Sequence, residues 1–202
     1  HQNLILFNDA VVYNPSHLFG FFSTFNPDIL KSAELYKSGI TADYGGRLSA
    51  VLDVRSREGN LKKISGSGGI SPVTGRLTLE GPIIKEKSSF LIGVRSTYSD
   101  WILKRLSNPS LRNSTASFYD VTANIYHKVN KNNTLHVSGY LGKDYLKLNS
   151  DTSYQYSDRN ASIKWKHMFN SKFFGSLTAS VSQYTYTMEG EQNSTNAFSL
   201  NF

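Results

Sequence analysis

The sequence predicts a mainly β protein in two parts. A compact segment of mixed α and β character, residues 1–59, precedes an antiparallel up-and-down meander, residues 60–202. Three observations predict the meander. Apolar and polar side chains alternate along most stretches after residue 59, short and long polar links alternate between them, and several candidate strands reach the nine to eleven residues, roughly, that a tilted membrane-crossing strand needs. The fold class is therefore an incomplete transmembrane β-barrel preceded by a partial α+β segment.

The composition suits this fold class. Charged residues make up 18% and hydrophobic residues 39% of the 202 residues, and Ser, Thr, Asn and Tyr fill the difference, as expected where apolar and uncharged polar positions alternate. No run of eighteen apolar residues occurs, so no transmembrane helix is predicted. The net charge of +7 comes from scattered Lys and Arg, which argues against nucleic acid as a partner. The absence of cysteine excludes disulfides, thiolate metal sites and cysteine nucleophiles.

The compact segment begins with a predicted hairpin over residues 4–13. Its turn is Asn8-Asp9, because these two residue types tolerate the positive φ that tight hairpin turns require. The elements expected next are an aromatic loop at 14–27, one helical turn starting at Pro27 with Asn26 as its cap, and strands at 34–37 and 49–55. The last of these is predicted from the alternation of its apolar residues.

Eight strands are predicted in the meander. They are expected at residues 61–71, 74–83, 88–98, 118–129, 134–148, 156–169, 172–187 and 196–202. In residues 119–129, for example, Val121 and Ile125 alternate with Asp120, Thr122 and Asn124. Tight polar turns and longer polar links follow one another between the later strands, which is typical of an outer-membrane barrel. A soluble β-barrel or sandwich with long twisted strands fits the same pattern.

Two further patterns leave alternatives open. Tyrosine and tryptophan near the strand ends predict an interfacial girdle or, on the other face, stacking platforms for sugars, because a one-residue slip in register exchanges the faces; these residues are Tyr140, Tyr145, Trp165, Tyr184 and Tyr186. Gly45-Gly46 is predicted to be a turn, and the glycine-rich run at 66–69 a strand that lets the compact segment approach the wall closely. Neither has the Lys-Ser/Thr pair of a phosphate-binding loop.

The candidate chemistry is sparse. None of the five histidines has metal-ligand spacing, and no G-x-S-x-G elbow occurs, so we predict no metal site, no cofactor and no enzymatic activity. Carboxylates and arginines that lie close in the sequence, among them Asp53, Arg55, Arg57 and Glu58, are interpreted as ion pairs between the compact segment and the wall. Paired catalytic acids are the rival interpretation of such a cluster.

Several stretches are similar to motifs of one family, in the same order and at the same spacing. Residues 4–12 resemble V-L-I-D-G-V-P-V, residues 25–39 resemble N-P-x-x-I-E-x-I-E-V-L-K-G, and residues 42–54 resemble Y-G followed by G-G-V-I-N-I. Residues 80–83 and 93–98 resemble early barrel strands of the same proteins, the TonB-dependent outer-membrane receptors. The chain departs from the motifs where Asn8-Asp9 replaces Asp-Gly and Ser49-Ala50 replaces Gly-Gly.

The resemblance implies a fragment that contains the C-terminal part of a plug domain, residues 1–59, and the N-terminal strands of an outer-membrane β-barrel, residues 60–202. It implies active transport of a large ligand (siderophore, cobalamin, glycan or peptide) across the outer membrane of a Gram-negative bacterium. The ligand would bind the extracellular loops and the plug apex, where Asn14, His17 and Phe19 are the candidate contacts by position.

The partners implied by the resemblance are TonB, through an N-terminal part absent from this sequence, outer-membrane lipid, the transported ligand and, as a further candidate, a surface lipoprotein. A soluble β-rich carbohydrate-binding module is the alternative function. An enzyme on a β-scaffold is the third hypothesis.

Overall fold

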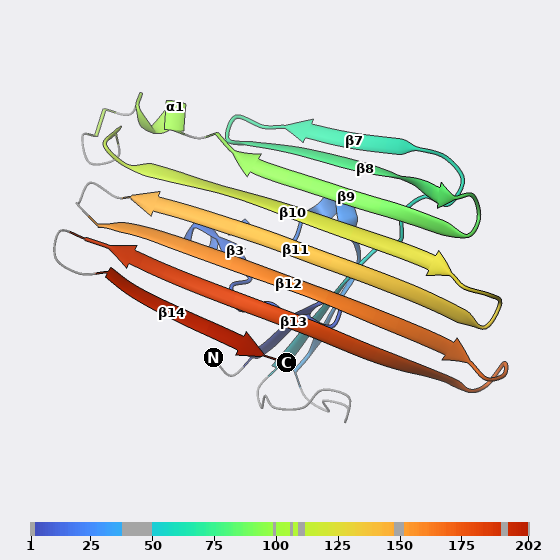
Figure 1. Cartoon of the computed structure of the whole chain (residues 1–202). Helices are drawn as coiled ribbons and strands as arrows, with labels where there is room; N and C mark the ends of the chain where they lie inside the picture. The colour runs from blue at the N-terminus through green and yellow to red at the C-terminus, as the bar shows by residue number, and fades with distance from the viewer. Residues whose placement is uncertain are drawn as a thin grey trace.

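The meander forms one continuous antiparallel sheet. The computed structural model describes residues 3–37, 50–98, 100–105, 107–108, 112–147, 152–190 and 194–201. Eight strands pair in chain order, from β7 at one edge to β14 at the other (Figure 1). They are β7 (Ser65–Ile70), β8 (Thr74–Ile84), β9 (Ser88–Thr97), β10 (Thr115–Lys128), β11 (Asn133–Lys147), β12 (Ser153–Met168), β13 (Phe174–Glu189) and β14 (Ser194–Asn201). The predicted fold class is confirmed, since the chain is mainly β with a long antiparallel meander.

Tight turns join the strands at one end of this sheet. Asn130, after β10, and Asn170, after β12, occupy equivalent places, and the side-chain oxygen of each accepts a backbone N–H two residues further on, at 2.9 Å in both cases. These side chains replace backbone partners, which is why asparagine favours such turns. At the other end the connection between β9 and β10 is longer and carries the short helix α1 (Asp100–Leu103). The remaining connections leave three to five residues between the strands at both ends, so the predicted alternation of short and long links is wrong.

The N-terminal segment, defined here as residues 3–59, forms a second sheet. Its strands are β1 (Asn3–Phe7), β2 (Ala10–Val11), β5 (Leu30–Tyr36) and β6 (Ala50–Ser56), in the order β2-β1-β6-β5. The hairpin turn is confirmed, with φ of 48° at Asn8 and 68° at Asp9. Strand β1 pairs with β6 in parallel, although the two are separated by more than forty residues.

The loop between β2 and β5 holds four short elements: β3 (Ser16–His17), the 3₁₀ turn η1 (Leu18–Gly20), β4 (Phe22–Ser23) and the 3₁₀ turn η2 (Pro27–Ile29). The predicted cap of η2 is confirmed, because the side chain of Asn26 accepts the backbone N–H of Asp28 at 3.1 Å. The turn predicted at Gly45-Gly46 lies outside the described residues.

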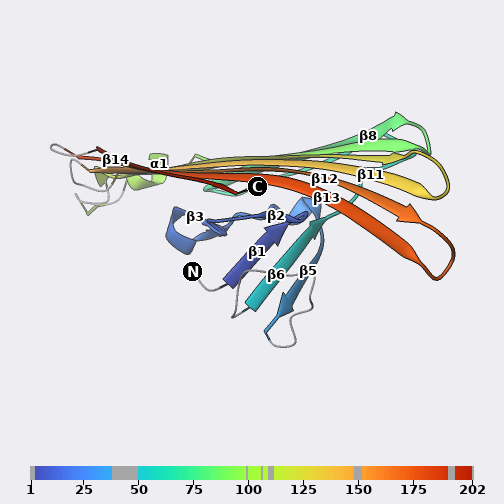
Figure 2. The ribbon, with the colours of Figure 1, turned by 60° about the horizontal axis from the view of Figure 1, so that its bottom comes forward.

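The N-terminal segment lies against one face of the meander sheet, called here the inner face (Figure 2). On β10 the side chains that point to this face are buried, and the central ones are polar: Asp120 is 1% exposed and Thr122 is 2% exposed, with the aromatic rings of Phe118 and Tyr126 on either side. The opposite, outer face exposes apolar side chains, which include Leu77, Ile92, Val94, Ile125, Val137, Ile163, Leu177 and Val181. Burial is therefore the reverse of that in a soluble sheet protein, where the apolar face is covered.

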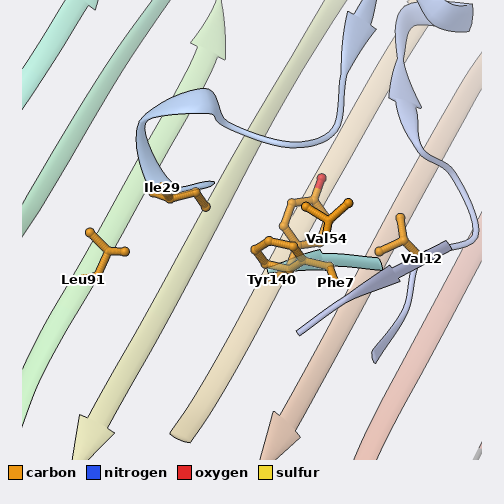
Figure 3. Packing of buried hydrophobic residues seen from close by; sticks show 6 residues of the cluster. All are labelled: Phe7, Val12, Ile29, Val54, Leu91 and Tyr140. Carbon is orange, nitrogen blue, oxygen red and sulfur yellow. The ribbon is translucent and has the colours of Figure 1, made fainter. Parts of the chain in front are cut away.

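A small apolar cluster joins the two sheets (Figure 3). Phe7, Val12, Ile29 and Val54 of the N-terminal segment pack with Leu91 of β9 and Tyr140 of β11. Tyr140 is 5% exposed and meets Phe7 edge to face, with ring centroids 6.2 Å apart. The girdle interpretation is therefore wrong for Tyr140, which points inward; it fits Trp165, which is exposed on the outer face.

One close approach of the N-terminal segment to the wall lies at a glycine that the sequence did not single out. A Cβ on Gly93 of β9 would stand 2.9 Å from Cγ2 of Ile29 and 3.1 Å from Nδ2 of Asn26. Around the glycine-rich run at 66–69, in contrast, the nearest atoms belong to the neighbouring strand β8. That run is a strand, as predicted, but it forms an edge and does not face the N-terminal segment. Within the described residues, no helix is long and apolar enough to cross a membrane.

Candidate functional site

The candidate site is the interface between the loop of residues 12–29 and the inner face of β9 to β12. The loop is closed on itself, because the Thr24 backbone N–H donates to the carbonyl of Pro15 at 3.0 Å and its hydroxyl donates to the carbonyl of Asn14 at 2.8 Å. It reaches the wall as a preformed unit with few free backbone groups. The contacts that hold it there are mainly polar.

His17 stands at the centre of this interface. Its side chain is 2% exposed and lies between two carboxylates of the wall, one on β10 and one on β11. The Nδ1 atom is 2.8 Å from Oδ2 of Asp144, and Nε2 is 3.3 Å from Oδ2 of Asp120. Asp144 also accepts the backbone N–H of Leu18 at 2.9 Å. Both ring nitrogens therefore face acceptors, an arrangement that suits the protonated imidazolium.

The electrostatics favour the protonated form of His17. Burial alone lowers its pKa, but the hydrogen bonds to Asp120 and Asp144, together with their charges, outweigh burial and raise the pKa above its ordinary value near 6.5. Arg95 of β9 is the second cation, and its guanidinium is 2.7 Å from Asp120. His17 and Arg95 thus face Asp120 and Asp144, and the net charge of these four side chains is close to zero.

Arg95 also ties the wall to the loop backbone. Its Nη2 atom donates to the carbonyl of Ser23 at 2.6 Å, and its guanidinium lies over the ring of Phe118, 5.2 Å from the centroid. The same ring stacks on His17, with centroids 4.2 Å apart and planes 5° from parallel. The ring of Phe118 therefore orients both the imidazole of His17 and the guanidinium of Arg95. This orientation directs their N–H groups toward the hydrogen-bond acceptors.

A third wall carboxylate holds the start of the loop. Oδ2 of Asp158, on β12, accepts the backbone N–H of Tyr13 at 3.1 Å and that of Asn14 at 3.2 Å. The Tyr13 ring packs against Tyr184 of β13, with centroids 6.2 Å apart. Tyr184 therefore points to the inner face, as the stacking interpretation of these aromatics requires.

Two further polar contacts lie nearer the tight turns of the wall. Asn8 donates to the hydroxyls of Ser56 and Ser138, and Asn124 of β10 donates to the same Ser56 hydroxyl at 2.9 Å. Beside them, both oxygens of Asp9 accept from Nζ of Lys164, at 2.9 and 3.0 Å. The hairpin turn of the N-terminal segment is therefore bound to three wall strands.

The last group of contacts between the N-terminal segment and the wall lies around η2. Arg57 forms an ion pair with Glu80 of β8 at 2.6 Å, and Arg76 of β8 forms one with Asp28 at 2.9 Å. Ion pairs between the compact segment and the wall, predicted from the sequence, occur here for Arg57. Arg55 instead pairs with Asp53 at 2.8 Å inside the N-terminal segment.

The three predicted ligand contacts lie on one loop but in different surroundings. His17 is buried against the wall, Asn14 is half-buried with its backbone on Asp158, and Phe19 lies in η1. Ligand contact by these residues stays a prediction. The wall residues Asp120, Asp144 and Arg95 were missed. A usable signal was present, because each is a charged residue on the polar face of an alternating strand.

Among the described residues, no group of three or more His, Asp or Glu side chains is arranged to hold a metal ion. The polar groups at the interface are instead consumed by contacts between the two sheets. The arrangement is that of a polar docking surface: it holds a separate folded segment by hydrogen bonds and ion pairs, which water can replace when the segment moves.

The described residues thus form an eight-stranded meander with a small four-stranded sheet docked on its inner face. One solved structure similar to it is the siderophore receptor PirA from Acinetobacter baumannii, with a TM-score of 0.70 and 12% sequence identity. The match covers 98% of this chain and 36% of that one, so this chain spans about a third of the receptor's length. At this identity the likeness concerns the fold alone. No protein-family model and no curated protein matches the sequence.

Proposed function

We propose that the chain is part of a TonB-dependent transporter that carries a large ligand across the outer membrane. The observation that carries this proposal is the reversed burial of the meander sheet. Apolar side chains are exposed on the outer face, Leu177 at 67% and Ile163 at 46%, while the inner face buries polar side chains against the N-terminal segment. A soluble binding module would have to cover that apolar face. Acyl chains of the outer membrane cover it at no cost to solubility.

In this proposal residues 1–59 belong to a plug and residues 60–202 to the first strands of the barrel. A plug must separate from the wall, or rearrange beside it, for a ligand to pass. The interface suits that task, since hydrogen bonds and ion pairs exchange for water at much lower free energy than buried apolar contacts do. TonB would supply the energy that drives the exchange.

The loop of residues 12–29 lies toward the end of the wall where α1 joins β9 to β10, and we place ligand contact there through Asn14, His17 and Phe19. A siderophore is the first ligand class to test, because the similar solved structure is a siderophore receptor. Cobalamin, glycan and peptide ligands follow. Outer-membrane lipid and TonB are the proposed partners.

A reducible cross-link tests whether the N-terminal segment must move. The sequence has no cysteine, so a pair can be introduced cleanly at Ser56 and Asn124, whose side chains meet at 2.9 Å across the interface. Cells that make the complete gene product are treated with a short bis-methanethiosulfonate cross-linker, and uptake of labelled ferric siderophores and cobalamin is measured. We expect uptake to stop on cross-linking and to return with reductant.

The matched control is a cross-link inside the wall. Lys143 and Ser157 are direct partners on β11 and β12 and lie on the outer face, away from the N-terminal segment. Cysteines at these two positions should cross-link without affecting uptake. Uptake that continues at full rate through the Ser56–Asn124 link would contradict the proposal.

A further inference from the structure

A cavity of about 160 Å³ lies between the N-terminal segment and the inner face of β10 to β12. On one side it is bounded by the Asn8-Asp9 turn and by residues 55–59, which follow β6. On the other side stand Lys164, Lys166 and His136 of the wall. The cavity is separate from the His17 group, which lies nearer the end of the wall that carries α1.

Cations outnumber acids in the lining of the cavity. Five of them, Lys31, Arg55, Arg57, Lys164 and Lys166, face only two acids in the lining, Asp9 and Glu58. Acids outside the lining pair with both arginines. Lys31 lies 3.8 Å from Glu58, and Lys164 binds both oxygens of Asp9. After these pairings, one of the five cations has no acidic partner within the described part of the chain.

The cation left over is Lys166. Among the described residues, its ammonium group has neither a hydrogen bond nor an ion pair, although its backbone is paired within the sheet. It stands two residues from Lys164 on the same face of β12, so the two ammonium groups are neighbours. His136, on β11, is the direct cross-strand partner of Lys164 and brings a neutral imidazole, with one N–H donor, to the same place. Like charges this close on one face are mutually unfavourable, and an anion between them relieves the repulsion.

We propose that this cavity binds an oxyanion group, a carboxylate or a phosphate, between Lys166, Lys164 and His136. The hydroxyls of Ser138 and Ser162 line the same cavity and offer neutral donors to the remaining oxygens. The site goes beyond the proposed transport, because anion binding requires neither TonB nor uptake. It has one mechanical consequence: a bound anion competes with Asp9 for Lys164, and so weakens a contact that holds the N-terminal segment on the wall.

Titration calorimetry of the complete gene product in non-ionic detergent tests the site. The probes are citrate for the carboxylate arm and tripolyphosphate for the phosphate arm, with glycerol as the uncharged comparison. We expect saturable binding of at least one anion, no binding of glycerol, and affinity that falls at least fivefold between 50 and 200 mM salt, roughly as expected when a few charges are neutralised. Absence of binding by both anions overturns the proposal.

Four variants locate the site. K166Q should weaken binding at least tenfold, and K166R should keep it within threefold, which shows that charge rather than folding is at stake. K143Q removes an exposed lysine of the outer face and should leave affinity within twofold. D9N should strengthen binding at least threefold, because Lys164 loses its competitor. If K143Q weakens binding as much as K166Q does, the anion is held by overall charge and the cavity is not the site.

Discussion

Replacement of His17 by alanine is expected to release the loop of residues 12–29 from the wall. The imidazole joins two buried carboxylates, and removal of one partner from a buried ion pair costs about 3 to 5 kcal/mol in general. Here Asp120 keeps Arg95 and Asp144 keeps the backbone N–H of Leu18. The cost should therefore lie near the lower end, about 3 kcal/mol, which corresponds to roughly a hundredfold change in an equilibrium constant.

Hydrogen exchange of the complete gene product in detergent measures this release. The reporters are the backbone N–H groups of Leu18 and Asn14, which are bonded to wall carboxylates only while the loop lies on the wall. We expect both to exchange about a hundred times faster in His17→Ala. Phe21→Ala is the matched control, since its side chain lies in the same loop and is 84% exposed. A change below fivefold, or an equal change in Phe21→Ala, would refute the assigned role of the histidine.

Three further outcomes are expected. Because the pKa of His17 is raised, its contribution to protection of the loop from exchange is complete below about pH 6.5 and is lost as the pH rises through the raised pKa. Exchange rates corrected for their intrinsic pH dependence should show this loss of protection. In His17→Asn the pH-dependent loss should be absent. Gly93→Val should lower the free energy of unfolding by about 1 to 3 kcal/mol through overlap with η2, whereas Gly139→Ala, where the nearest atom is 4.0 Å away, should change thermal unfolding little. Asp9→Asn should lower the free energy of unfolding by about 1 kcal/mol, because the ion pair with Lys164 is lost. In a double-mutant cycle, the same substitution should cost much less when Lys164 has already been replaced by Gln.

Local features of the fold were predictable from the sequence because their causes are local. The positive φ of Asn8 and Asp9 and the cap at Asn26 each depend on a few adjacent residues. Strand existence followed from alternation, and only the ends differed: β7 starts at Ser65 rather than at residue 61, and β10 starts at Thr115 rather than at residue 118. Strand ends depend on pairing with neighbours, which a single strand does not encode.

The candidate site was predicted only in part, for a different physical reason. His17 was singled out, but its partners Asp120 and Asp144 lie more than one hundred residues away in the sequence. The residues that contact His17 depend on the register of four strands and on the final position of the loop against the wall. The inward direction of Tyr140 was open for the same reason, since alternation defines two faces without assigning either to the interior.

The contacts of the N-terminal segment also set an order of assembly. Asp9 meets a lysine 155 positions further on, and His17 meets a carboxylate 127 positions further on. Closure of such long stretches is entropically unfavourable until intervening hairpins have shortened the effective distance. The N-terminal segment precedes the wall strands in the chain and is nevertheless among the last parts to reach its final position. Until β12 is in place, the early segment has only its own four strands to satisfy its polar groups, and water must serve for the rest.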